Sequence, residues 1–244
     1  MPRLTRLVMR NVEYGQLFAL FNFPSLRNLS IDPVENQEPM EIVWGKLHVP
    51  PVTTVNVEYL VPRHGKISIT GSSEGSSFSL TERAAEARTA RMIRSLSNAP
   101  LASVTTLSVG RGVPELGVQL PSASICDLIA VLPHLRRLDL FPSKLTAAVT
   151  EYLQNNPLVC PELRILSLTA VSKTHEDLFW SLSKLAADRR NANLQLHRID
   201  LVVLMGGNAR ETAEHWETMT GLCRFGDLVR CNCGGEVRQT CGCA

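Results

Sequence analysis

The sequence predicts an α/β fold in which short parallel strands alternate with helices. The spelling L-x-x-L-x-L appears as Leu135-Arg-Arg-Leu138-Asp-Leu140 and returns as Leu163-Arg-Ile-Leu166-Ser-Leu168. Alternate side chains of a strand face one way, so the second and third leucines enter a core. Segments with helical spacing of apolar residues lie between the copies. This recurrence is typical of leucine-rich repeats, and we predict an irregular solenoid with a curved parallel sheet on its concave side and helices on its convex side.

Seven segments fit the motif in order, and a repeat explains them better than chance matches in a leucine-rich chain. Neighbouring starts lie 22 to 33 residues apart, except for one interval of 52 that predicts a hidden or distorted repeat. No Asn or Cys stands eight residues past any start, so the turning backbone must find other hydrogen-bond partners. The starts are Leu4, Leu26, Val52, Val104, Leu135, Leu163 and Leu196.

A strand-loop-strand excursion near residues 61–80 fills the long interval. Residues 63–70 and 78–80 read as short strands around a flexible Gly/Ser-rich turn at 71–77. Thr81 then begins a helix that runs to about Leu96. Further helix starts are predicted at Ser122, Thr146, Thr174 and Asn208.

Composition indicates one folded domain over residues 1–222 and a disordered Cys/Gly-rich tail over 223–244. The 244 residues are 44% hydrophobic and 20% charged, with a formal net charge of +2. This near balance points to no polyanionic partner. With no apolar leader or membrane-length apolar run, we expect an intracellular location, in the cytoplasm or nucleus, and no membrane partner. No cofactor is predicted, and Cys126 and Cys160 read as reduced core residues.

The order of these features resembles the repeat region of the F-box-type leucine-rich-repeat proteins abundant in basidiomycete fungi. The likeness covers about residues 4–204 and rests on the excursion, the helix after it, and the segments 99–109, 132–140 and 160–168. It implies a non-catalytic substrate-recognition region of an F-box-type ubiquitin ligase subunit. In that family an F-box binds a Skp-type adaptor, but here the first motif begins at Leu4. We therefore expect this chain alone not to bind that adaptor.

Other function classes fit the sequence less well. A stand-alone scaffold without a ligase connection is the main alternative, and a zinc-binding tail protein comes third. Residues 71–75 spell G-x-S-x-G, the nucleophile elbow of α/β-hydrolases, but a strand-forming segment follows instead of a helix, so no catalytic residue is assigned. The scattered histidines form no metal or acid–base motif.

A basic stripe is predicted on the helix after Thr81, formed by Arg83, Arg88, Arg91 and Arg94. No aromatic residue accompanies these arginines, and Glu82 and Glu86 balance them. A solvated helix face is therefore the preferred interpretation, and nucleic acid is not an expected partner.

The tail contains two C-x-C pairs that are candidates for a zinc site. Structural zinc sites more often use a C-x-x-C knuckle, so a disordered tail is preferred and no metal site is assigned. The four candidate ligands are Cys231, Cys233, Cys241 and Cys243.

The residues between the buried leucines predict the working surface. They share the concave face, which solenoids use for extended protein partners. We expect a protein partner on the C-terminal half, where Phe141 beside charged residues has the character of a binding hot spot, unless it merely covers a neighbouring repeat. The candidates there are Arg137, Asp139, Phe141, Ser167, Thr169, Arg198 and Asp200, and the rest of the face includes Arg6, Val8, Asn28, Ser30, Asp32, Thr54, Asn56, Glu58, Thr106, Ser108 and Ile165.

Overall fold

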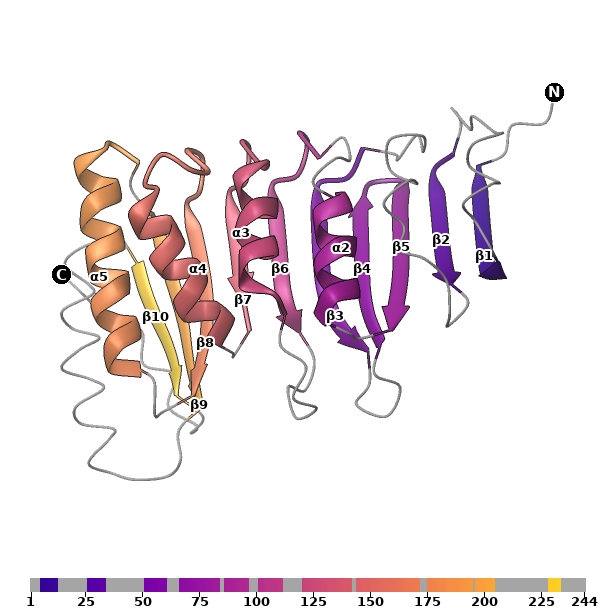
Figure 1. The fold of residues 1–244 in the computed structure, drawn as a ribbon. Helices are drawn as coiled ribbons and strands as arrows, with labels where there is room; N and C mark the ends of the chain where they lie inside the picture. The colour runs from indigo at the N-terminus through magenta and orange to yellow at the C-terminus, as the bar shows by residue number, and fades with distance from the viewer. Residues whose placement is uncertain are drawn as a thin grey trace. The chain divides into compact units, whose positions relative to one another are not determined.

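The computed structural model describes residues 5–12, 26–33, 51–60, 66–83, 86–96, 101–111, 120–141, 144–171, 175–194, 196–204 and 228–233. The chain divides into two compact units, Met1–Leu132 and Pro133–Ala244. Each unit combines helices with strands of an open sheet (Figure 1). The α/β class predicted from the sequence is therefore confirmed.

The first unit places its strands in the order β1-β2-β5-β4-β3-β6. Apolar and polar side chains alternate along them, and the apolar ones form the core on one face of the sheet. Ile69 and Leu80 on the sheet and Ile93 and Leu96 on the helix that follows are fully buried. The elements are β1 (Arg6–Val12), β2 (Asn28–Pro33), β3 (Thr54–Leu60), β4 (Lys66–Ser73), β5 (Ser76–Arg83), α2 (Glu86–Leu96), β6 (Thr106–Arg111) and α3 (Ser122–Ala130).

Strand pairing in this unit follows the register of the motif. Leu7 lies beside Leu29, and Val55 lies beside Leu107, so the second apolar positions of paired copies are direct neighbours. Both pairings are parallel, but β4 runs antiparallel to β3 and to β5. The expected parallel sheet is therefore interrupted here, because a tight turn reverses the chain where a parallel pair would need a long crossover.

The position of the excursion differs from the prediction. Strands β3 and β6 pair directly, so no distorted repeat separates them. The β4–β5 hairpin lies on the other side of β3, and β5 pairs in parallel with β2. The connection from β3 to β4 is short, so β4 pairs with one edge of β3 as its antiparallel neighbour, and the other edge of β3 pairs with β6.

The hairpin turn is shorter than the predicted loop at residues 71–77. Only Glu74 and Gly75 form the turn between β4 and β5, and Gly75 has a φ of 76°. The serines on either side continue the strand alternation and belong to the ladder. Thr81 also belongs to β5, so the predicted helix start is wrong and α2 begins at Glu86 instead.

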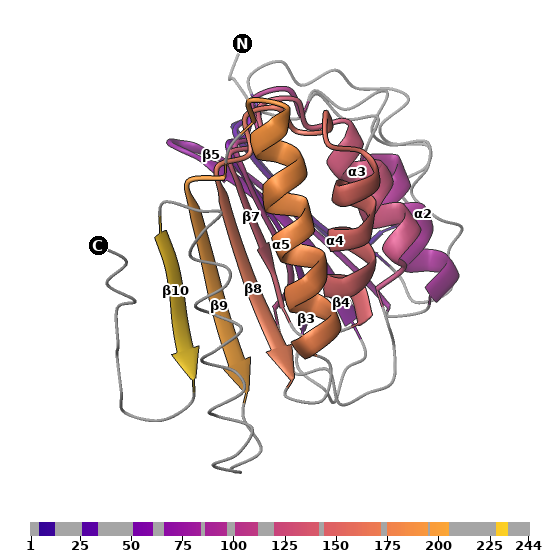
Figure 2. The ribbon, with the colours of Figure 1, turned by 90° about the vertical axis from the view of Figure 1, so that its left-hand side faces the viewer.

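The second unit repeats strand and helix in regular order. Its elements are β7 (Arg137–Leu140), α4 (Lys144–Asn155), β8 (Ile165–Val171), α5 (His175–Asn191), β9 (Arg198–Leu204) and β10 (Leu228–Cys233). The four strands lie side by side in chain order, and the pairs β7–β8, β8–β9 and β9–β10 are parallel. Helices α4 and α5 pack together on one face of the strands (Figure 2). Leu138, Leu166 and Ile199 are fully buried register neighbours under them.

Backbone hydrogen bonds repeat just before the strands of this unit. The carbonyl of Arg136 accepts from the amides of Arg164 (2.9 Å) and Ile165 (3.0 Å). The carbonyl of Arg164 in turn accepts from His197 (2.9 Å) and Arg198 (3.1 Å). The same double acceptance occurs at the start of β6 in the first unit. Equivalent positions of successive motif copies therefore have equivalent backbone partners.

Two predicted helix starts need correction. The N-cap of α3 is Pro121 and makes no side-chain capping bond, so Ser122 is the first helical residue and not the cap. Helix α4 begins at Lys144, two residues before Thr146. No described helix is both long and apolar enough to cross a membrane. Outside the described residues lie two further predicted starts, Thr174 and Asn208.

Part of the tail that was expected to be disordered forms a strand. Leu228–Cys233 is β10, and it pairs in parallel with β9 along its full length. The apolar pair Leu228 and Val229 suits a strand, and pairing satisfies backbone groups that the edge of β9 would otherwise expose. The candidate ligands Cys231 and Cys233 lie on this strand, whereas Cys241 and Cys243 lie outside the described residues.

A buried arginine supplies partners for the turn between α4 and β8. The Arg189 side chain on α5 has 0% exposure. Its guanidinium donates to the carbonyls of Pro157 (3.1 Å), Val159 (3.0 Å), Cys160 (2.9 Å) and Leu194 (3.2 Å). Burial lowers the pKa of Arg189. At this turn, where no Asn column exists, one guanidinium satisfies the carbonyls.

Candidate functional site

Charged side chains gather on the face of β7, β8 and β9 that is opposite to α4 and α5. The leucines of each motif point to the helices, so the residues between them share the other face. Strand register then places these residues in rows. The rows are Arg137-Ile165-Arg198 and Asp139-Ser167-Asp200. The structure thus brings together five of the seven residues predicted for partner binding.

Ion pairs within single strands organise this face. The Nε of Arg137 donates to both carboxylate oxygens of Asp139, at 2.9 and 3.0 Å. Arg198 binds Asp200 through two nitrogens, with Nε 2.8 Å from Oδ1 and Nη2 2.7 Å from Oδ2. The hydroxyl of Ser167 donates to Oδ2 of Asp200 at 3.3 Å. An arginine two residues before an aspartate is enough to form each pair, because residues i and i+2 share a strand face.

The two ion pairs are electrostatically linked. The hydrogen bond that Arg198 donates to Asp200 raises the pKa of Arg198, and the charges of Asp200 and Asp139 add to this effect. The side chains of Arg137 and Arg198 are 41% and 33% exposed, whereas their aspartates are 16% and 17% exposed. Such partly exposed pairs add little to stability. Their arrangement instead offers a polar surface on which two aspartates balance two arginines.

The predicted hot-spot residue Phe141 is half-buried. It follows directly after β7, and its carbonyl accepts a hydrogen bond from the Thr146 hydroxyl at 3.4 Å. Phe141 thus lies where β7 turns toward α4. Thr169 lies on β8 beside Val202 of β9.

A second polar surface lies on the first unit, formed by residues between the apolar positions of six strands. It consists of two rows across the sheet, which we call the hydroxyl rows because Ser, Thr and Asn dominate them. Neither row contains a carboxylate. Asn56 bridges two strands by donating to the Thr70 hydroxyl at 3.4 Å. The rows are Arg6-Asn28-Ser77-Ser72-Thr54-Thr106 and Val8-Ser30-Ser79-Thr70-Asn56-Ser108.

Four of these twelve residues were missed by sequence reasoning. Thr70, Ser72, Ser77 and Ser79 lie on the hairpin, where the sequence predicted two short strands around a flexible turn and placed no binding residue. A signal was present, because hydroxyl residues alternate with Ile67, Ile69, Phe78 and Leu80 on either side of the turn.

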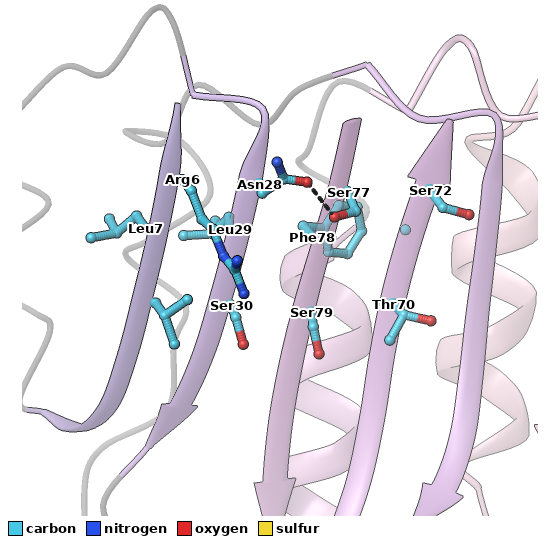
Figure 3. A pocket seen from close by; sticks show the side chains of 12 residues that line it. Arg6, Leu7, Asn28, Leu29, Ser30, Thr70, Ser72, Ser77, Phe78 and Ser79 are labelled. Carbon is cyan, nitrogen blue, oxygen red and sulfur yellow. Dashed lines mark hydrogen bonds between the residues drawn. The ribbon is translucent and has the colours of Figure 1, made fainter. Parts of the chain in front are cut away.

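A pocket of about 420 Å³ opens on the part of the hydroxyl rows that covers β1, β2, β5 and β4 (Figure 3). Small side chains line its centre, which is why this part of the sheet face is hollow. The Ser77 hydroxyl donates to Oδ1 of Asn28 at 2.8 Å and fixes the amide at one side of the pocket. Arg6 from β1 extends over β2 toward Ser30 (Figure 3).

Gly71 and Phe78 close the pocket from the core side. They are register partners on β4 and β5, and Phe78 is buried. A Cβ at position 71 would lie 2.1 Å from Cε1 of Phe78. The ring therefore packs against bare backbone, a close approach that only glycine permits in the strand interior.

The G-x-S-x-G segment lacks the geometry of a nucleophile elbow. Ser73 ends β4, and the turn after it leads into a strand where an elbow requires a helix. Its hydroxyl donates to the carbonyl of Pro51 at 2.9 Å. Among the residues that the structure describes, no cluster of three or more His, Cys, Asp or Glu side chains suits a metal ion.

The predicted basic stripe is not formed as expected. Arg83 ends β5 and does not lie on α2, because the hairpin extends further than predicted. Arg88 and Arg91 fall on α2, and Arg94 is exposed in its last turn.

Comparison of the chain with protein-family models, with curated proteins and with solved structures finds no match.

Proposed function

We propose that this chain is a non-catalytic protein-interaction module of the leucine-rich-repeat solenoid type. The face of β7, β8 and β9 is its partner-binding surface in this proposal. The observation that carries it is the register of the motif. Leu138, Leu166 and Ile199 are neighbours in adjacent parallel strands, and so are Leu140 and Leu168. Stacked copies of one motif with equivalent backbone bonds are what a repeat architecture requires.

The chemistry of the proposed surface favours a protein partner. Its ion pairs present both signs of charge in fixed positions, which suits a complementary polar surface. In the part of the chain that the structure describes, the titratable groups of this face are paired with each other along a strand. A catalytic site would instead need a convergent cluster around a pocket.

A finer proposal concerns the kind of module. We propose that it serves as the substrate-recognition region of an F-box-type ubiquitin ligase subunit. The support is the resemblance of segments 132–140 and 160–168 and the order of features around them. The hairpin β4–β5 and the helix α2 occur in the order that this resemblance implies. A stand-alone scaffold makes the same use of the surface but has no link to ubiquitin.

We also propose an intracellular location. Cys126 and Cys160 form no disulfide and are buried in the described core. Buried reduced thiols are ordinary for proteins kept in a reducing compartment.

Site-specific photo-crosslinking in cells that express the chain tests the proposed surface. A photoreactive phenylalanine replaces Ser167 at the centre of the charged face. The matched control replaces Lys184, which is exposed on α5. We expect a discrete protein adduct from position 167 that is absent from position 184 and is reduced at least tenfold by Arg137→Glu with Phe141→Ala. Equal adducts from both positions, or none from position 167, would contradict the proposal.

The same adduct separates the ligase from the scaffold. A ligase substrate loses ubiquitin and rises in level when the gene that encodes the chain is deleted. A scaffold partner changes in neither respect.

A further inference from the structure

The pocket on the first unit differs from the charged face of the second unit in its balance of charge. Of the twelve residues that line it, Arg6 alone carries a charge. Within the part of the chain that the structure describes, Arg6 forms no ion pair. Arg137 and Arg198, in contrast, are each held by an aspartate of their own strand. The pocket therefore offers an uncompensated guanidinium.

The rest of the lining can only support an anion or a neutral polar group. Hydroxyls and the Asn28 amide surround the guanidinium, and hydroxyls donate hydrogen bonds by simple rotation. Neither hydroxyl row contains a carboxylate, and none lines the pocket. The volume of about 420 Å³ lies within the roughly 300–1,000 Å³ typical of ligand pockets.

We propose that this pocket binds a carboxylate side chain, an Asp or Glu carried by an acidic segment of a protein partner. A single guanidinium neutralises one negative charge and binds a carboxylate through two parallel hydrogen bonds. Recognition of a phosphorylated residue commonly uses a cluster of arginines, and the lining holds only Arg6. The charge of the pocket thus matches a monoanion.

The shape of the pocket argues for a group carried by a larger molecule. All of its lining comes from four adjacent strands, so it is walled on the sheet side by one layer of the fold. A free small molecule is usually enclosed over most of its surface. A side chain from a docked segment needs enclosure only at its tip. This inference rests on the proposed function solely in taking the partner to be a protein, and it uses a different surface.

Nuclear magnetic resonance of the full chain with isotope-labelled arginine tests the pocket. The Nε signal of Arg6, assigned by its loss in Arg6→Lys, is followed during titration with acetyl-Gly-Ser-Glu-Ser-Gly-amide. Matched peptides replace Glu with Gln or with phosphoserine. We expect saturation by the Glu peptide with a dissociation constant of about 1 mM. The Nε signal of exposed Arg94 in the same sample should respond at least tenfold more weakly, and the Gln peptide should not shift Arg6.

Two substitutions test whether the Glu peptide binds in the pocket. Ser30→Asp places a carboxylate next to Arg6 on the neighbouring strand and should weaken the Glu peptide at least tenfold by occupying the guanidinium. Thr106→Asp makes the same change in a hydroxyl row but outside the pocket, and should leave binding within twofold. Both variants are checked by thermal unfolding.

Several results would overturn the proposal. Equal shifts of Arg6 and Arg94 would reveal nonspecific pairing, and tenfold tighter binding of the phosphoserine peptide would make the site one for phosphate. Tighter binding of free acetate than of the Glu peptide would show that no protein segment is needed. Because these titrations do not depend on capture of a partner, they can fail while the crosslinking at position 167 succeeds, and the reverse.

Discussion

Replacement of Arg189 by methionine tests how the turn between α4 and β8 is stabilised. Methionine keeps an unbranched apolar stem but removes every N–H donor. The bond to the carbonyl of Cys160, at 2.9 Å, is fully buried. The bonds to the carbonyls of Pro157, Val159 and Leu194 are only partly buried, so water can replace the guanidinium there.

Two effects of the substitution oppose each other. Removing a buried charge relieves a desolvation cost of several kcal/mol. Leaving a dry carbonyl without a donor costs about 1–3 kcal/mol, and each carbonyl that water can reach costs about 1 kcal/mol. Cys160 also has a φ of 50°, a left-handed conformation that the surrounding bonds must maintain. We expect the losses to win, by about 2–4 kcal/mol for Arg189→Met. Arg189→Lys should be at least as harmful, because it keeps a buried charge without the planar fork.

Urea unfolding followed by circular dichroism measures this loss, and hydrogen exchange of the amides at 157–163 locates it. The matched control is Arg190→Met, since Arg190 is the next residue and is exposed. The control should change the free energy of unfolding by no more than about 0.5 kcal/mol. If the two variants unfold at the same urea concentration and exchange alike, the guanidinium is not what maintains the turn.

Three further predictions follow from local geometry. Gly71→Ala should lower the free energy of unfolding by about 1–3 kcal/mol because its Cβ meets the Phe78 ring. The double variant Gly71→Ala with Phe78→Leu should lose less stability than the sum of the losses in the two single variants, and additive losses in thermal unfolding would contradict this. Hydrogen bonds from His134, which has the larger effect, and from Arg136 lower the pKa of Glu162. The stability that Glu162 contributes is therefore complete above about pH 4.5 and is lost as the pH falls through the lower pKa of the folded state. Glu162→Gln should therefore unfold at a lower temperature than the parent near neutral pH and at the same temperature at about pH 2, and a constant difference would refute it. Burial raises the pKa of the Cys160 thiol to about 12, so mass spectrometry should find this cysteine unalkylated in the folded chain at about pH 8 and alkylated in urea; rapid labelling without urea would show the site to be open.

The motif allowed the strand faces to be predicted but not the order of the strands. Alternation with a period of two decides which residues are buried, and this holds from Leu29 in β2 to Ile199 in β9. The order of the strands depends on which strand pairs with each free edge. The β4–β5 hairpin pairs with one edge of β3, and β6 pairs with the other. The serines around Gly75 also read as a loop, although they continue the strand alternation.

The charged face could be predicted because both members of each ion pair lie on one strand. Arg189 could not be assigned in this way, since its acceptor at Cys160 is 29 residues away and belongs to a turn. A signal did exist, because Arg189 continues the buried stripe of Leu178, Leu182 and Leu185 on α5, whereas Arg190 does not. A charged residue on an apolar stripe indicates burial with partners, but the sequence does not say which carbonyls they are.

The two surfaces differ at one position of the motif, and this difference can be tested directly. Arg137 and Arg198 are each followed two residues later by an aspartate, whereas Arg6 is followed by Val8, which is 45% exposed. Val8→Asp should therefore build in β1 the ion pair already present in β7 and β9, because the two side chains share a strand face. We expect this variant to unfold at the parent temperature, since an exposed pair adds little stability, and to bind the Glu peptide at least tenfold more weakly. If Val8→Asp binds that peptide as well as the parent does, the free charge of Arg6 is not what makes the pocket a site for carboxylates.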